Sequence, residues 1–205
     1  MHRKMLAAAA AWAYLLVPAL WGSGEANNYG YLVQAGPPCT VWWAEGAYKV
    51  MKDDSVPAAK DGIIRLAAAR NEYEPFIIVL RPEVRLESVR VAPGPLINDK
   101  GGTIGPADVS ICHVEYVKVT TPTDALGTAG WWPDPLPPYD GPFSAPAGEN
   151  HPLWTTVHVP KSAQPGLYKG EIALTADNWS CRLPIELCVR GFALPDKASV
   201  RSSFG

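Results

Sequence analysis

The chain has 205 residues, of which 47% are hydrophobic and 19% are charged, so its composition is that of a globular domain with a real core. Its formal net charge at pH 7 is −2, which excludes the basic field that nucleic acid or an anionic membrane surface would require. The 21 prolines and 18 glycines demand many turns and favour short strands over long helices.

The first 26 residues have the order of a secretory signal peptide. A short basic start, His2-Arg3-Lys4, precedes an apolar run over 6–21, and small residues follow. We expect cleavage after Gly24 or Ala26 and a protein that is secreted, periplasmic or at the cell surface, with no membrane anchor after cleavage. A retained anchor is the alternative; Pro18 and the absence of basic residues just after the apolar run count against it.

The mature part contains Cys39, Cys112, Cys181 and Cys188. Export permits disulfides, and four cysteines allow three pairings. Cys181 and Cys188 cannot bond to each other, because seven residues of one strand separate them by about 23 Å and place them on opposite faces. The sequence has no Cys-x-x-Cys pair and therefore no zinc or redox motif of that kind, so we expect buried free thiols.

Almost every periodic segment has a period of two, which predicts strands. The expected strands cover 40–50, 62–66, 76–80, 86–91, 109–120, 153–159, 168–174 and 181–189. Trp42 and Trp43 should point to opposite faces of the first strand. A change of apolar phase near His113 to Tyr116 indicates a bulge. With no convincing amphipathic helix, the fold class is all-β. We predict an antiparallel two-sheet β-sandwich, immunoglobulin-like or galactose-binding-like, over residues 27–195.

The segment from Thr121 to Pro152 contains eight prolines and shows no strand pattern. Its clustered tryptophans argue against disorder and favour an ordered loop across a surface or a partner. Trp131 and Trp132 have two interpretations: stacking on sugar rings, or packing as apolar anchors, which we favour. With Asp134 they are the candidate contacts to carbohydrate or to another domain. Packing is favoured more strongly for Trp154, which lies in a strand.

Four groups of residues resemble, in the same order, glycoside hydrolase family 123 and its uncharacterised relatives. They are Ala68–Phe76, which includes Arg70, Asn71 and Glu72; Pro133-Asp134-Pro135-Leu136; Asn150–Trp154 followed by Val159–Lys161 and Pro165–Gly170; and Phe192–Pro195 followed by Ser203–Gly205. The resemblance implies an N-terminal β-sandwich followed by a catalytic (β/α)8 barrel. Residues 196–205 are expected to begin the linker into that barrel, which this chain lacks.

The resemblance also implies that the parent enzyme removes β-linked N-acetylgalactosamine, with an Asp–Glu pair of the barrel assisted by the substrate's acetamido group. Neither barrel carboxylate has a counterpart here, so we assign no catalytic residue and expect this chain to be inactive alone. Asp134, Asp140 and Glu149 are local acids without a defined spacing. We assign structural roles to Trp154 and to Arg70, Asn71 and Glu72, where a buried glutamate paired with Arg70 or Arg65 would order the start of the next strand.

Three functions fit these observations. The favoured one is an accessory domain of a secreted glycoside hydrolase, which supports the barrel and lays the Trp-Pro loop beside its cleft. The alternatives are an autonomous carbohydrate-binding module and a structural interaction domain of the cell envelope. We expect no cofactor and no metal, because the histidines lack a metal-binding spacing. The expected partners are the barrel and a glycan.

Overall fold

The computed structural model describes residues 28–124 and 127–197. The expected signal peptide and most of the expected linker lie outside these residues. The described part consists of strands with one short 3-10 helix, η1 (Pro106–Asp108). Within it, no helix is both long enough and apolar enough to cross a membrane.

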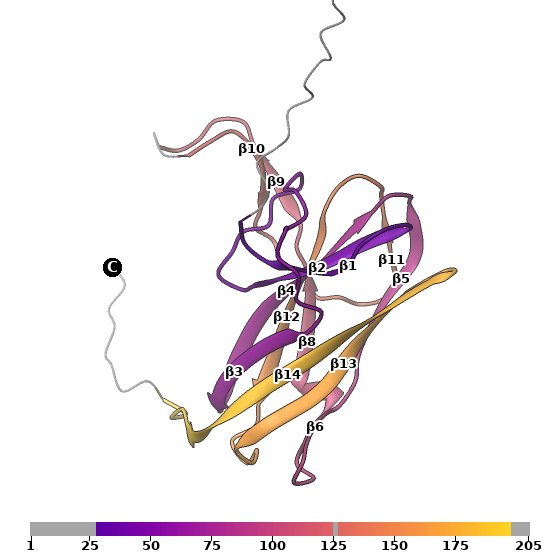
Figure 1. The fold of residues 1–205 in the computed structure, drawn as a ribbon. Coiled ribbons are helices and arrows are strands. Elements are labelled where there is room, and N and C mark those ends of the chain that lie inside the picture. Colours follow the sequence, from indigo (N-terminus) through magenta and orange to yellow (C-terminus); the bar gives the residue numbers. More distant parts are fainter. Residues whose placement is uncertain (1–27, 125–126, 198–205) are drawn as a thin grey trace, which may run out of the picture.

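Two large sheets build the molecule, and Figure 1 shows their arrangement. The first sheet has the order β1-β2-β4-β12-β8, and all its neighbouring strands are antiparallel. Its strands are β1 (Tyr31–Gln34), β2 (Cys39–Glu45), β4 (Glu72–Pro82), β12 (His151–Val159) and β8 (Val109–His113).

The second sheet has the order β11-β5-β13-β14-β3, and two short strands, β6 and β7, extend it beside β13. Its pairs are antiparallel except the edge strand β3, which runs parallel to β14. Its strands are β11 (Phe143–Ala145), β5 (Leu86–Pro93), β13 (Gly166–Ala176), β14 (Trp179–Ala193), β3 (Ile64–Arg70), β6 (Leu96–Asn98) and β7 (Thr103–Ile104). The predicted all-β sandwich is confirmed, with this one parallel pair added.

The core has two parts because the first sheet is covered on both faces. One part fills the space between the sheets, and Trp43 and Ile78 belong to it. The other contains Trp42, Ile77 and Val50, and the segment that follows β2 contributes to it. Trp42 and Trp43 thus point to opposite faces, as predicted. The same two-sided burial explains the uninterrupted apolar run in β4, since a strand covered on both faces has no need to alternate.

The alternation of β14 matches its burial. Cys181, Leu183, Ile185, Leu187 and Val189 are all buried and face the core. An alternating strand places its intervening residues on the opposite face.

All four cysteines are free thiols, but burial differs from the expectation. Cys39 and Cys181 are buried, Cys112 is half-buried and Cys188 is exposed. Burial raises the pKa of the Cys39 thiol to about 12 and also raises the pKa of the Cys181 thiol. The expectation of buried thiols is therefore correct for two positions and wrong for Cys188.

The predicted bulge in the 109–120 strand is wrong, because two separate strands occupy this range. β8 pairs with β12 in the first sheet, whereas β9 (Tyr116–Val119) pairs with β10 (Gly130–Pro133) in a separate ribbon. Between them the backbone changes partners: the His113 and Glu115 amides donate to the carbonyls of Pro137 and Pro135, at 2.9 Å each. The change of apolar phase therefore marks a change of sheet.

Several strand boundaries also differ from the predictions, and β4, β13 and β14 each extend beyond the expected range at both ends. The segment 121–152 contains β10 and β11, whose few residues are too short to show alternation. The first long strand ends at Glu45 and is preceded by the short β1. β3 continues through three alanines to Arg70, because parallel pairing with β14 overrides the helix preference of alanine in so short a segment.

Candidate functional site

The β9–β10 ribbon carries the two candidate tryptophans and projects from the sandwich at the top of Figure 1. In its register Trp131 lies opposite Lys118, and Trp132 lies opposite Val117. The Trp131 side chain is 46% exposed. Trp132 is half-buried, and its indole N–H donates to the Thr128 carbonyl at 2.9 Å. The two rings therefore lie in different environments, and Trp131 is the more accessible one.

Three lysine ammonium groups lie over the tryptophan rings. Lys52 and Lys118 place their Nζ atoms 5.2 and 5.9 Å from the centroid of a Trp131 ring, and Lys49 lies 5.5 Å from Trp132. Lys49 and Lys52 come from the segment that follows β2, so this segment holds the base of the ribbon. Each such contact is worth about 0.5–1 kcal/mol at an exposed position. The lysines also supply hydrogen-bond donors beside an aromatic surface.

A polar cavity of about 400 Å³ lies next to this ribbon, and Lys52, which lies over the Trp131 ring, also lines the cavity. Its volume is in the range of small-molecule sites, about 300–1,000 Å³. It is lined by Lys52, His113, Val114, Glu115, Tyr116, Phe143, Ser144, Glu149, Asn150, His151 and Pro152.

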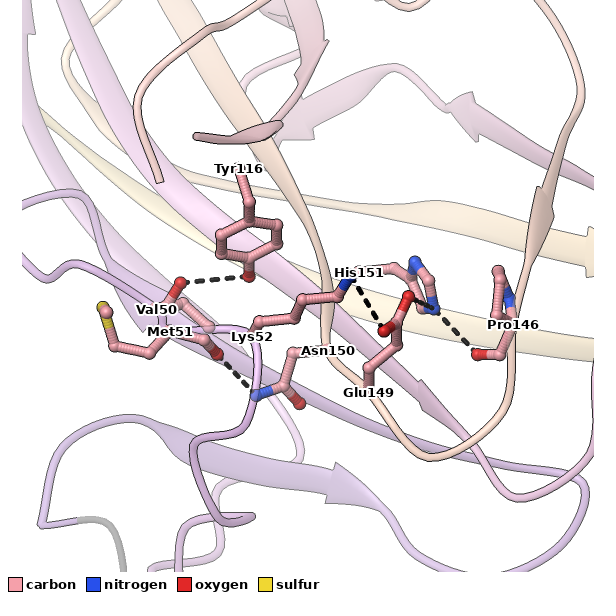
Figure 2. Close-up of polar contacts among 8 residues, drawn as sticks. All are labelled: Val50, Met51, Lys52, Tyr116, Pro146, Glu149, Asn150 and His151. Carbon is pink, nitrogen blue, oxygen red and sulfur yellow. Dashed lines mark hydrogen bonds and ion pairs between the residues drawn. The ribbon is translucent and has the colours of Figure 1, made fainter. Parts of the chain in front are cut away.

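Figure 2 shows the charged pair on one wall of this cavity. Lys52 Nζ lies 3.0 Å from Glu149 Oε2, and His151 Nε2 lies 3.9 Å from the other oxygen of Glu149. His151 Nε2 is 2.8 Å from the Pro146 carbonyl, which can only accept, so this nitrogen carries the hydrogen. Burial lowers the pKa of His151 and that of His113. In the neutral His151 ring, Nδ1 is therefore an acceptor.

A buried asparagine fixes the position of Lys52. Asn150 is 1% exposed, and its side-chain amide donates to the carbonyls of Met51 and Asp54, at 3.0 and 2.9 Å. Its side-chain oxygen accepts from Arg81 at 3.2 Å, and its backbone amide donates to the Lys52 carbonyl at 2.9 Å. The wall that carries Lys52 is therefore tied to the start of β12.

Tyr116 holds the neighbouring part of the same wall. Its hydroxyl donates to the Val50 carbonyl at 3.1 Å, and burial raises the pKa of this hydroxyl (Figure 2). The segment 50–54 is thus fixed from β9 as well as from β12, and the cavity is formed in advance of any ligand.

A second, smaller cavity of about 260 Å³ brings Asp134 and Trp154 together. It lies against the segment after β2, where Tyr48 and Lys49 contribute to its lining. Trp154 also packs against the buried cluster around Trp42. The Asp134 backbone amide donates to the Glu115 carbonyl at 3.1 Å, which anchors the base of the ribbon.

The other predicted residues, Arg70, Asn71 and Glu72, lie at the β3–β4 turn, far from the ribbon in Figure 1. The Leu194 amide donates to the Arg70 carbonyl at 2.8 Å, and the Asn71 side chain donates to Leu194 and Asp196 at 3.1 Å each. Asn71 has a φ of 64°, a left-handed conformation that asparagine tolerates well. This turn therefore binds the chain that leaves β14, and we call it the exit corner.

The expected pairing of Glu72 or Glu74 with Arg70 or Arg65 is wrong. Glu72 accepts a hydrogen bond from the Ala69 backbone amide at 2.5 Å, and Arg65 pairs with Asp61 and Glu186. Backbone donors left free by the sharp turn are nearer to Glu72 than either guanidinium, so the carboxylate caps the turn.

The three local acids do not line one common cavity. Glu149 lines the larger cavity, Asp134 lines the smaller one, and Asp140 lines neither. Glycoside hydrolysis requires two carboxyl groups facing one substrate, about 5–9.5 Å apart. Within the described residues no group of three or more His, Cys, Asp or Glu side chains is arranged to hold a metal ion.

Sequence reasoning did not identify Lys52, His151 or Asn150 as parts of a site. Asn150 and His151 stand in one of the motifs that resemble family 123, which was the available signal. Lys52 stands in no motif, and the Asn150–Met51 hydrogen bond joins residues 99 positions apart.

Comparisons with known proteins agree with the architecture. A solved structure of a family 123 glycoside hydrolase from Clostridium perfringens, studied for glycolipid glycan hydrolysis, superposes with a TM-score of 0.52 at 20% identity. The match covers 64% of this chain but only 23% of that enzyme. The CooA pilin subunit of enterotoxigenic Escherichia coli matches 72% of this chain and 97% of its own, at 13% identity and a TM-score of 0.35, which carries no argument.

No curated protein matches the sequence. A family model described as the glycoside hydrolase 123 N-terminal domain matches residues 48–176, which is more than half of the chain. The chain therefore belongs to the family of glycoside hydrolase 123 N-terminal domains.

Proposed function

We propose that this sandwich is a non-catalytic accessory domain of a secreted family 123 glycoside hydrolase. In this proposal it supports a catalytic (β/α)8 barrel that acts on β-linked N-acetylgalactosamine, and its 121–152 segment lies beside the substrate cleft. The observation that carries the proposal is the match to the N-terminal family over 48–176, together with the 23% share of the Clostridium perfringens enzyme that the chain covers. Secretion rests on the composition of residues 1–26.

The exit corner supports the mechanical half of this proposal. Tyr73, Phe192 and Leu194 are 67%, 59% and 37% exposed, although all three are large and apolar. They follow the β3–β4 turn or the end of β14, where the chain leaves the sandwich. Exposed apolar side chains at such a place favour a packed neighbour. We assign this patch to the barrel that follows in family members.

Arg70 and Lys161 stabilise the same corner. The Arg70 guanidinium donates to the Lys161 and Gly191 carbonyls at 3.5 Å each, and Lys161 Nζ lies 2.7 Å from Asp196. The Lys161 pair lowers the pKa of the Asp196 carboxyl. Because the Arg70–Lys161 contact and the Leu194–Arg70 hydrogen bond bring together three of the motifs that resemble family 123, we infer that the motifs shape the connection between the domains.

The test begins with the genomic reading frame past the codon for Gly205. We expect it to encode a barrel, and we expect the full product, but not the 205-residue chain, to hydrolyse an aryl β-N-acetylgalactosaminide. Phe192→Asp in the full product should lower its melting temperature, whereas Ile97→Asp, a control at an exposed residue of β6, should not. Hydrolysis by the 205-residue chain, or a frame without a barrel, would refute the proposal.

A further inference from the structure

We propose that the polar cavity beside the β9–β10 ribbon binds one uncharged pyranose ring of a glycan, with Trp131 as the aromatic contact. This inference goes beyond the accessory role, because it assigns binding to the sandwich alone, with or without a barrel. It rests on three observations: the exposed indole, the donor–acceptor pair on the cavity wall and the charge of the lining.

Trp131 offers the apolar half of such a site. A pyranose presents C–H groups on its faces, and an exposed indole provides a flat, polarisable surface for them with little side-chain entropy to lose. Nearly half of the Trp131 side chain is open to solvent. Lys52 lies over its ring and also lines the cavity, so the indole and the cavity are neighbours.

Lys52 and Glu149 offer the polar half. Their charged atoms are 3.0 Å apart, so one ammonium donor and one carboxylate acceptor stand side by side. Two adjacent hydroxyl groups of a sugar match this pair, because each hydroxyl both donates and accepts. His151 also lines the cavity, and the Nδ1 atom of its neutral ring is an acceptor. The wall is held by Asn150 and Tyr116, so little ordering is required on binding.

The charge of the lining selects an uncharged sugar. The cavity is lined by one ammonium group, that of Lys52, and two carboxylates, those of Glu115 and Glu149. Its histidines, His113 and His151, have lowered pKa values and are neutral at pH 7. Lys118, over Trp131, brings a second ammonium group to the site, so its charges balance, and a uronic acid would add an unpaired negative charge. The structure therefore favours a neutral hexose or N-acetylhexosamine.

The experiment is a titration of the isotope-labelled 205-residue chain, followed by the tryptophan indole signals in two-dimensional NMR. The probes are methyl β-galactopyranoside, methyl N-acetyl-β-galactosaminide and, as the anion, glucuronic acid. We expect a neutral probe to shift the Trp131 signal saturably at up to about 10 mM, and glucuronic acid to bind more weakly. The Trp131 signal is assigned by its loss in Trp131→Ala.

Substitutions distinguish binding at the proposed site from nonspecific binding and from loss of folding. Trp131→Ala and Glu149→Gln should each weaken binding by at least about tenfold, as expected for the removal of a central contact. Tyr73→Ala removes an even more exposed aromatic ring at the exit corner, 67% exposed against 46% for Trp131, and should leave binding unchanged. The spectra of the variants report their folding directly. The proposal is overturned if no neutral probe saturates, if glucuronic acid binds more tightly, or if Tyr73→Ala weakens binding as much as Trp131→Ala. None of these outcomes bears on whether a barrel follows.

Discussion

Replacing Asn150 by alanine should destabilise the domain by about 3 kcal/mol. The side chain makes three hydrogen bonds, to the Met51 and Asp54 carbonyls and from Arg81, at 2.9–3.2 Å. Each bond contributes roughly 1 kcal/mol net, and a buried partner left unsatisfied costs about 1–3 kcal/mol. Since Asn150 is 1% exposed, water cannot easily replace the lost groups.

Urea unfolding followed by tryptophan fluorescence measures this loss as a change in the free energy of unfolding. Asn178→Ala is the matched control, because Asn178 is exposed in the turn between β13 and β14 and should change stability by no more than about 0.5 kcal/mol. Asn150→Asp keeps the shape but turns the donor into an acceptor facing two carbonyls, so it should also destabilise. A loss below about 1 kcal/mol for Asn150→Ala would show that the network does not hold the segment 50–54.

Two further predictions concern titration and thiol reactivity. Burial lowers the pKa of His113 and His151 in the folded state, so the unfolded chain takes up protons first as the pH falls below 6.5. The stabilisation from the two neutral histidines should be fully present above pH 6.5, and the free energy of unfolding should decrease below it. Urea unfolding midpoints measured as a function of pH test this. The prediction is contradicted if the midpoint of the double variant His113→Gln/His151→Gln falls with pH as steeply as that of the unchanged protein. In thiol labelling, exposed Cys188 should react at once, whereas Cys39, whose pKa is about 12, and Cys181 should react only on unfolding. Fast labelling of all four cysteines in the folded chain would disprove the burial of Cys39 and Cys181.

Much of the fold was predictable because burial follows local alternation. The inner face of β14 and the opposite orientations of Trp42 and Trp43 both follow from the period of two. Ser88 shows where this rule fails: its φ of 53° interrupts β5, and Leu86 and Val89 can both be buried although three positions separate them. The pattern of apolar residues shows only a change of phase between Leu86 and Val89, and this change does not identify the backbone irregularity that causes it.

The candidate site was predictable only in its aromatic part. Clustered tryptophans in a Pro-rich segment drew attention to Trp131 and Trp132 directly. The cavity depends on contacts between Lys52 and the Asn150 region, which are brought together by the pairing of β2, β4 and β12. A contact between segments so far apart in the sequence cannot be predicted from a local pattern of residues. The partner change after His113 was missed for the same reason, since strand pairing is decided by the whole sheet.

The parallel pairing of β3 with β14 has a mechanical consequence. Both strands end at the exit corner, where Arg70 lies opposite Ala193 and the Leu194 amide is bonded to the Arg70 carbonyl. Tension applied to the chain beyond Leu194 therefore runs along the axis of β14. When the opposing force acts on the N-terminal end of β3, the hydrogen bonds between β14 and β3 are loaded in shear and all together, whereas a hairpin pulled apart at its open end breaks one bond at a time. The sandwich is thus built to resist pulling from its C-terminal side.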